Sequence, residues 1–440
     1  MQTKFHSLIS RWCVASVAAG TVWLSGCATG NVASTSPVYV AGTKMQGTVH
    51  GGQNAVIGAT IQLYAAGSSG YGSPSLALLT TAVTSDSNGN FNITGDYTCP
   101  STSSQVYLTA VGGNPGSGTN ANLSLMAALG NCGNLTSSTF VLVNELTTVA
   151  AAYALTPFMT AYTAIGTSST NTLGLANAFA SAQKLVNAAT GTAPGIAPAG
   201  AVIPVNELNT LADILAACVN TQGGTASDTS TSCGQLFSYA TPSGGTAPTE
   251  TIGAALLIAR NPTHQVSNLF TLSSSTAPFQ PTLTSATDFT VSIKYASAGL
   301  SNPSSAGFDG SGQLWVSNAG DNTVTRFDVT GAPTTISGGG LSAPSGIALD
   351  ASGNAWVTNK TGNSVTTITS AGSASPASIT AGTLSKPTGI AIDGLGNLWI
   401  SNSGSSQVSE IGISGTTVTS NVNYSTGGVS APIAIAVNPK

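Results

Sequence analysis

Alternating apolar and polar residues mark the segment 42–112 as β-structure. Short runs such as Gly58–Tyr64 alternate along the chain, and the turn Ser85–Asn90 separates two of them. Side chains of a strand point alternately to the two sides of a sheet, and Asn-Gly pairs are typical of tight hairpins. The segment is therefore predicted to be a small antiparallel β-sandwich.

The order of these runs also carries a resemblance. The sequence from Gly47 through Gly58–Tyr64 to Phe91-Asn92-Ile93 is similar to carboxypeptidase-regulatory-like and collagen-adhesin B-type modules. This resemblance implies an immunoglobulin-like spacer without catalytic activity. Asp86, Asn88 and Asn90 are interpreted as hairpin residues, because the full calcium-loop pattern with its terminal Glu is missing.

The hydrophobic period changes to a helical one in residues 138–272. Apolar residues between Leu142 and Ala154 recur three or four positions apart, and the pattern returns at 173–189, 206–219, 249–260 and 264–272. These segments predict an Ala-rich bundle of about five helices. Residues 113–137 are assigned to a connector, and residues 273–287 to a linker.

Three similar units follow from residue 288 onwards. Each has a Pro, a short apolar run, an Asp-x-x-Gly turn, a Trp and an Asn, and the prolines, including a fourth at Pro432, lie 41, 43 and 45 residues apart. This is the period of a four-stranded propeller blade. The units resemble NHL-repeat β-propellers, in the order Pro303, Asp309, Trp315, Asn318; Pro344, Asp350, Trp356, Asn359; Pro387, Asp393, Trp399, Asn402.

Each repeated residue has an expected mechanical role. Pro starts the innermost strand, Asp caps the hairpin turn, Trp packs between adjacent blades, and Asn satisfies backbone groups. Three blades, a preceding strand at 289–295 and a trailing strand at 433–437 are too few to close a ring. We therefore expect either a truncated gene product or an open stack of blades that another copy completes through its exposed edge.

The fold class predicted for the whole chain is thus multidomain: a small β-sandwich, an Ala-rich α-helical domain, and an incomplete set of NHL-type β-propeller blades in 288–440. The order of these parts resembles uncharacterised bacterial NHL-repeat lipoproteins.

The N-terminus has the features of an export signal. Lys4 and Arg11 precede an apolar run, 12–24, that is too short to span a bilayer. The run ends in Leu24-Ser25-Gly26-Cys27, which resembles the lipobox of bacterial lipoproteins. This resemblance implies removal of residues 1–26, lipid attachment at Cys27, a tether over 27–41, and a location at the cell envelope. The absence of Asp after Cys27 favours the outer membrane, on its periplasmic or surface face.

Four cysteines remain after the signal and lipid positions are set aside: Cys99, Cys132, Cys218 and Cys233. An even number in an exported chain predicts disulfides. Three pairings exist, and the pairing of Cys99 with Cys132 and of Cys218 with Cys233 is the most economical because it closes short loops. A zinc site is disfavoured, since there is no Cys-x-x-Cys spacing and little His.

Charge is scarce along the whole chain. Asp, Glu, Lys and Arg make up 5% of the residues, and the chain after residue 26 has 8 basic and 14 acidic residues without a basic cluster. This composition argues against nucleic acid as a partner. Glu145, Glu207 and Asp213 are interpreted as helix-terminal or solvated charges, and no metal or cofactor is predicted.

Three classes of function follow. The first is a non-catalytic envelope protein whose blades present a binding face to a protein or glycan. The second is an enzyme, because the blades resemble streptogramin lyases, yet the mature chain holds only His50 and His264, both outside the blades. The third is a structural or adhesive matrix protein. No known catalytic motif selects the enzyme.

Overall fold

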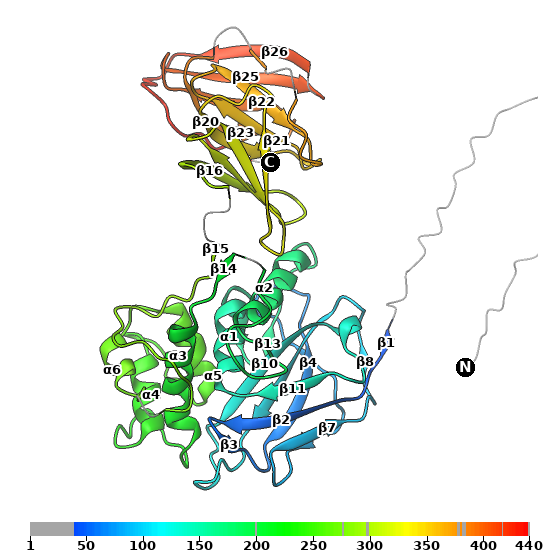
Figure 1. Ribbon diagram of the computed structural model, residues 1–440, viewed down its shortest axis with the longest axis vertical. Coiled ribbons are helices and arrows are strands. Elements are labelled where there is room, and N and C mark those ends of the chain that lie inside the picture. The colour runs from blue at the N-terminus through cyan, green and yellow to red at the C-terminus, as the bar shows by residue number, and fades with distance from the viewer. Residues whose placement is uncertain are drawn as a thin grey trace, which may run out of the picture. The chain divides into compact units, whose positions relative to one another are not determined.

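The computed structural model describes residues 39–198, 200–274, 277–295, 299–375, 379–380, 384–415 and 417–438 (Figure 1). The predicted signal segment 1–26, most of the tether and Cys27 lie outside these residues. Within the described ranges, no helix is both long and apolar enough to cross a membrane. The fold is mostly β, with several small sheets and six α-helices among the described residues.

Two small sheets form the β-part of residues 39–143. One has the order β10-β9-β4-β5, with β6 also paired to β4, and the other has the order β11-β2-β3, with β7 paired to β2. All neighbours are antiparallel except β11 and β2, which run parallel. The bounds are β2 Met45–Gly51, β3 Asn54–Ala55, β4 Thr60–Ala65, β5 Leu76–Ala77, β6 Val83–Thr84, β7 Asn90–Ile93, β9 Gln105–Val111, β10 Ser124–Asn131 and β11 Phe140–Val143; a short pair, β1 Val40–Ala41 and β8 Thr98–Cys99, lies beside them.

The β-part extends beyond the segment predicted for it. The connector expected at 113–137 contains β10, and the range 138–272 expected to be helical begins with β11. The reason lies in burial on both faces of β10: Leu125 and Ala127 face the second sheet, whereas Met126 and Ala128 face the helices. A strand that is buried on both faces shows no alternation of apolar and polar residues, so the hydrophobic pattern does not predict it.

The helices pack against this β-part and against one another. Their bounds are α1 Glu145–Leu155, α2 Thr172–Leu185, α3 Val205–Val219, α4 Ser232–Ala240, α5 Thr251–Arg260 and α6 Val266–Phe270, with 3-10 turns at Cys132–Asn134 and Thr156–Phe158 and the short strands β12 Met159–Ala161, β13 Ala164–Ile165, β14 Ala201–Val202 and β15 Lys294–Tyr295. Asn144 caps α1 by accepting a hydrogen bond from the Thr147 N–H. Nine of the eleven residues of α1 are buried, so this helix is the centre of the helical core.

Both disulfides are present with the shortest pairing. Cys99 bonds to Cys132, and Cys218 bonds to Cys233, with sequence separations of 33 and 15 residues. The first joins the end of β8 to the turn after β10, and the second joins the end of α3 to the start of α4. All four cysteines are buried.

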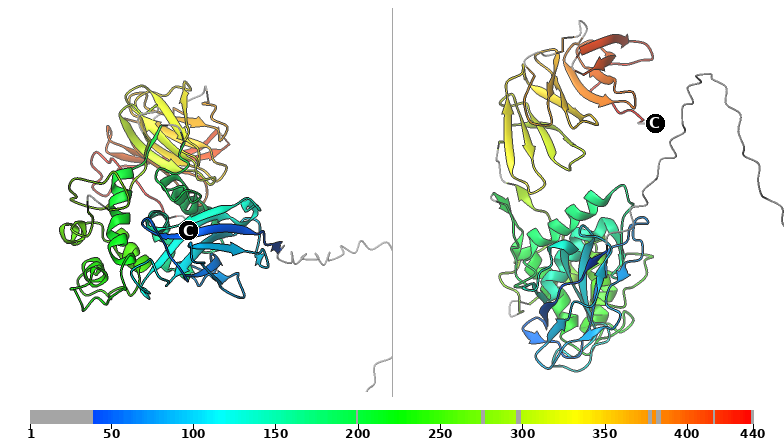
Figure 2. Two further views of the ribbon diagram at one scale, coloured as in Figure 1. Left: turned by 60° about the horizontal axis from the view of Figure 1, so that its bottom comes forward. Right: turned by 90° about the vertical axis from the view of Figure 1, so that its right-hand side faces the viewer.

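The repeated units form three successive antiparallel sheets, which we call repeat sheets 1, 2 and 3. Figure 2 shows them side by side in an open stack, in yellow to red, and the described residues do not close a ring. Sheet 1 is β16 Pro303–Phe308, β17 Leu314–Asn318, β18 Thr323–Phe327 and β19 Pro333–Ser337; sheet 2 is β20 Pro344–Leu349, β21 Ala355–Asn359 and β22 Ser364–Ile368; sheet 3 is β23 Pro387–Ile392, β24 Leu398–Asn402, β25 Gln407–Ser414 and β26 Thr417–Tyr424.

The repeated Asp ties the first hairpin of each sheet to its Trp. In sheet 2, Asp350 Oδ1 accepts from the Ser352 and Asn354 N–H groups at 2.9 Å each, and Asp350 Oδ2 accepts from Trp356 Nε1 at 3.1 Å. The same indole bond measures 2.9 Å in sheets 1 and 3, to Asp309 and Asp393. These carboxylates therefore organise turns and are fully engaged within their own sheets.

The repeated Asn joins each sheet to the loop before it. The side-chain oxygens of Asn318, Asn359 and Asn402 accept from the N–H groups of Ser301, Ser342 and Ser385 at 3.4, 3.1 and 3.1 Å. Their amide groups donate to hydroxyls of the next strand, such as Thr366 Oγ1 at 2.9 Å from Asn359. All three Asn side chains are fully buried.

Neighbouring sheets also share one repeated hydrogen bond and one apolar core. Ser304 Oγ donates to the Pro344 carbonyl at 2.7 Å and Ser345 Oγ to the Pro387 carbonyl at 2.8 Å. The equivalent Thr388 Oγ1 of sheet 3 donates at 3.1 Å to the carbonyl of Pro432, which follows β26 and lies outside the three sheets. Trp315 and Trp356 are 0% and 1% exposed because the following sheet covers them. Trp399 is partly exposed and stacks on Tyr424 of its own sheet, with ring centroids 5.6 Å apart.

This difference in burial predicts that truncation of Trp356 and of Trp399 to Ala lowers the free energy of unfolding by different amounts. We expect Trp356→Ala to lower the free energy of unfolding by about 3–5 kcal/mol, as for other buried aromatic residues. Trp399→Ala should cost clearly less, because part of its ring already contacts solvent. Denaturant unfolding monitored by circular dichroism checks this, and equal losses at the two positions would contradict the role assigned to the covered Trp.

Candidate functional site

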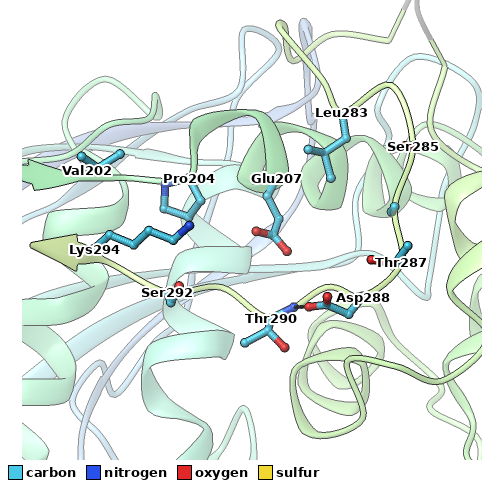
Figure 3. Close-up of a pocket in the computed structure, with 11 residues that line it drawn as sticks. Val202, Pro204, Glu207, Leu283, Ser285, Thr287, Asp288, Thr290, Ser292 and Lys294 are labelled. Carbon is cyan, nitrogen blue, oxygen red and sulfur yellow. Dashed lines mark hydrogen bonds between the residues drawn. The ribbon is translucent and has the colours of Figure 1, made fainter. Parts of the chain in front are cut away.

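A polar cavity of about 370 Å³ lies between the start of α3, the strand β14 and residues 283–294 (Figure 3). We call residues 277–294 the strap. Glu207 from α3, Asp288 from the strap and Lys294 from its end all line the cavity. This volume falls in the range of small-molecule sites.

Three hydrogen bonds from one face of α3 hold the first half of the strap. Asp213 Oδ1 accepts from the Phe279 N–H at 3.1 Å, Asn209 Nδ2 donates to the Pro281 carbonyl at 2.8 Å, and Thr210 Oγ1 accepts from the Leu283 N–H at 2.9 Å. Residues 209, 210 and 213 lie on one side of a helix because they are one to four positions apart. The strap is therefore fixed to the same helix that supplies Glu207.

The second half of the strap is held by burial and by strand pairing. Phe289 is 0% exposed within the helical core, and its N–H donates to the Pro262 carbonyl at 2.9 Å. Lys294 then pairs with Val202 in the two-residue ladder of β14 and β15. The strand expected over 289–295 is thus reduced to Lys294–Tyr295, because Phe289 packs into the helical core.

Charge is concentrated in this cavity. Burial and, to a smaller extent, the nearby carboxylate of Asp288 raise the pKa of Glu207 to about 7, and Lys294 acts in the opposite direction. Asp288 is oriented by the Thr290 N–H, which donates to its Oδ1 at 2.9 Å. At neutral pH the cavity therefore contains one carboxyl close to its midpoint, a second carboxyl and an ammonium group.

A buried hydroxyl lies close to the two acids. The Tyr153 hydroxyl of α1 has no hydrogen-bond partner among the described residues. Burial raises its pKa well above the ordinary value, and the charges of Glu207 and Asp288 act in the same direction. An unsatisfied buried hydroxyl is costly, so a polar ligand or a water reaching it would stabilise the site.

Hydroxyl side chains complete the lining. Ser285, Thr287, Thr290 and Ser292 line the cavity along the strap (Figure 3). Hydroxyls donate and accept, carboxylates accept, and the ammonium donates. The cavity can therefore both donate hydrogen bonds to a small hydroxylated molecule and accept hydrogen bonds from it.

The sequence-predicted residues have different positions. Glu207, interpreted as a helix-terminal charge, lies in the first turn of α3 but also lines the cavity. Glu145, interpreted in the same way, does lie in the first turn of α1, although its side chain is buried. Asp213 lies in the middle of α3 and is buried, so its interpretation as a helix-terminal or solvated charge was wrong. Asp288 and Lys294 were not singled out from the sequence, because no local pattern distinguishes them and their neighbours in the cavity are distant in the chain.

The remaining predicted residues lie elsewhere. The disulfides and the repeated Pro, Asp, Trp and Asn residues do not line this cavity. His264 Nε2 lies 2.8 Å from the Thr241 carbonyl, and His50 lies in β2. Within the described ranges, no group of three or more His, Cys, Asp or Glu side chains is arranged to hold a metal ion.

Comparisons with known proteins give a weak likeness. No family model matches the sequence, and no curated protein matches it. Solved propeller structures match about a third of the chain: "Streptogramin B lyase structure" covers 32% at 18% identity and TM-score 0.29, and virginiamycin B lyase from Staphylococcus aureus covers 33% at 20% identity and TM-score 0.29. Hydrazine synthase of Kuenenia stuttgartiensis covers 32% at 19% identity and TM-score 0.27.

These matches cover only part of this chain and only part of each known protein. The matched region spans 47%, 48% and 40% of the length of those three proteins. At such TM-scores they assign neither an activity nor a ligand to this chain.

The charges in the cavity predict opposite effects of two substitutions on the pKa of Glu207, about 7 in the unaltered protein. Asp288→Asn should lower this pKa because it removes a neighbouring negative charge, and Lys294→Met should raise it because it removes a positive charge. Carboxyl-carbon NMR titration of Glu207, assigned with Glu207→Gln, measures both. Shifts of the same sign in the two variants would contradict the proposed electrostatics.

Proposed function

We propose that this chain is a non-catalytic binding protein of the cell envelope, and that the cavity beneath the strap holds one unit of a hydroxylated ligand such as a glycan. The observation that carries the proposal is the lining of the cavity. Four hydroxyl side chains, two carboxyl groups and one ammonium group converge there. Sugar units present closely spaced hydroxyls, which need both donors and acceptors around them.

The repeat sheets support a scaffold role in the same proposal. Their Asp, Trp and Asn side chains bond to turns and strands within each sheet. The Ser304 and Ser345 hydroxyls link adjacent sheets. The paired polar groups therefore hold the sheets together. We propose that the sheets add a surface that contacts the ligand or a protein partner.

The proposed location at the outer membrane depends on Cys27, which lies outside the described residues. Two buried disulfides fit an oxidising compartment. Lipid attachment would anchor the protein to the membrane.

Labelling with a fatty acid tests this location. The protein should incorporate the label in bacterial cells, and Cys27→Ala should abolish incorporation, because the thiol is the attachment point. Gel autoradiography with and without an inhibitor of the lipoprotein signal peptidase is the measurement. Equal labelling of the Cys27→Ala variant would contradict the anchor.

Binding to a glycan panel tests the ligand class. We expect the purified protein to bind a subset of oligosaccharides, and Asp288→Asn to weaken the Kd about tenfold or more, because hydrogen bonds to a charged group contribute about 1.5–3 kcal/mol. Asp86→Asn is the matched control, since Asp86 lies in the exposed β6–β7 turn. Calorimetry gives both constants. Binding that is absent, or equal in the two variants, would overturn the glycan site.

A second candidate function rests on the same cavity. A carboxyl with a pKa of about 7 beside another carboxylate is a common arrangement in acid/base catalysis. The two candidates differ in the effect of Glu207→Gln: it should leave glycan affinity within about threefold if Glu207 only contributes to the binding surface, and it should abolish turnover if Glu207 is an acid or base.

A further inference from the structure

Two buried carboxyl groups lie at the beginning of the strap, outside the cavity. Glu145, the first residue of α1, is 0% exposed, and Asp213 of α3 is 1% exposed. They are close enough for the charge of Asp213 to act on Glu145. Carboxyl groups are seldom buried without a cation or several donors, so this pair requires an explanation.

Each carboxyl binds a different segment. Both oxygens of Glu145 accept from the Gly52 N–H, at 2.9 and 3.0 Å, in the turn between β2 and β3. Asp213 accepts from the Phe279 N–H with one oxygen at 3.1 Å. Gln53 Nε2 donates to the Pro278 carbonyl at 3.3 Å. The turn and the start of the strap therefore meet beside the carboxyl pair.

Among the described residues, no Lys, Arg or His lowers the pKa of Glu145 or Asp213 by its charge. The second oxygen of Asp213 has no hydrogen-bond partner within the described part of the chain. Arg260 donates to Tyr71 Oη at 2.9 Å and to the Met159 carbonyl, in the neighbourhood of β12. Other titratable groups on α1, on the elements packed against α1 and α3, and on the adjoining β2 strand are His50, Tyr153, Lys184, Glu207, Tyr239 and Glu250.

Glu250 and His50, two of these groups, do not supply a positive charge to the carboxyl pair. Glu250 Oε1 accepts from the Gly253 N–H at 2.8 Å at the start of α5. His50 is disfavoured as a cation, because burial lowers its pKa. Glu145 accepts from the Gly52 N–H and from its own backbone N–H, and Asp213 accepts from the Phe279 N–H alone. Burial in the apolar core outweighs these donors, so the folded protein favours the protonated acids.

We infer that Glu145 and Asp213 form a proton-dependent clasp, which holds the strap while the two carboxyl groups carry protons and loosens it when both are ionised. The clasp follows from the buried contacts alone. Its effect on ligand binding rests on the proposed function, because the strap lines the cavity.

The direction of the pH effect follows from burial. Burial raises the pKa of Glu145 to about 8 and that of Asp213 to about 7, above the ordinary values of 4.5 and 3.8. An acid with a raised pKa in the folded state stabilises that state fully below its ordinary pKa, and this stabilisation is lost as the pH rises through the raised value. The clasp should therefore weaken between about pH 4.5 and pH 8 and change little above that range.

Hydrogen exchange at several pH values tests the clasp in the full chain without ligand. After correction for intrinsic exchange, protection of amides 277–294 should fall about tenfold or more between pH 5 and pH 8.5, since each proton released on opening contributes up to tenfold per pH unit. Amides of β21 serve as the internal reference and should not follow this profile.

Two variants make the outcome decisive. Glu145→Gln and Asp213→Asn keep an acceptor for Gly52 and Phe279 but cannot ionise, so each should flatten the pH dependence of the strap, and the double variant should remove it. Asp86→Asn should leave it unchanged. A flat profile in the unaltered protein, or an unchanged slope in the double variant, would overturn the clasp. Neither result depends on glycan binding, so failure of the clasp and failure of the glycan site are distinguishable.

Discussion

The polar face of α3 holds the strap in place, and the cavity exists because of it. Asn209, Thr210 and Asp213 bond to three successive points of the strap within 3.1 Å. Without these bonds the backbone of Phe279, Pro281 and Leu283 would lose its partners, and the amide of Phe279 would lose its partner in a buried position. Since unpaired buried backbone groups are costly, the helix and the strap order each other.

The same helix brings acidic groups into two different environments. Glu207 lies in the first turn, where the cavity admits solvent and Lys294, whereas Asp213 lies two turns later in the apolar core. Burial raises both pKa values to about 7. Glu207 is therefore open to the cavity, whereas Asp213 makes a structural contact with the strap.

The elements with a local signal were predictable from the sequence. The ranges 206–219 and 249–260 match α3 and α5 closely, because helical periodicity and caps are local properties. The repeated Pro, Asp, Trp and Asn positions likewise fall at the same places in all three repeat sheets. The strands β10 and β11 were missed, because β10 is buried on both faces and β11 pairs parallel with a distant strand.

The cavity was not predictable for a different reason. Glu207 and Asp288 are 81 positions apart, and only the fixed path of the strap brings them together. A stretch rich in Pro, Ser and Thr such as 277–287 is typical of a linker. Nothing in the composition of residues 277–289 shows that Phe279 and Phe289 anchor this segment to a helical core. Long-range contacts decide this site, and local patterns do not report them.

The hydroxyl-to-carbonyl bonds that link successive repeat sheets have an architectural consequence. The bonds of Ser304 and Ser345 each connect a sheet only to its immediate successor, as does each shared apolar core. Cohesion in such an array is a sum of nearest-neighbour contributions, as in linear solenoids. Duplication of one whole unit would leave every other junction chemically unchanged, so the array can change in length during evolution without redesign of its joints.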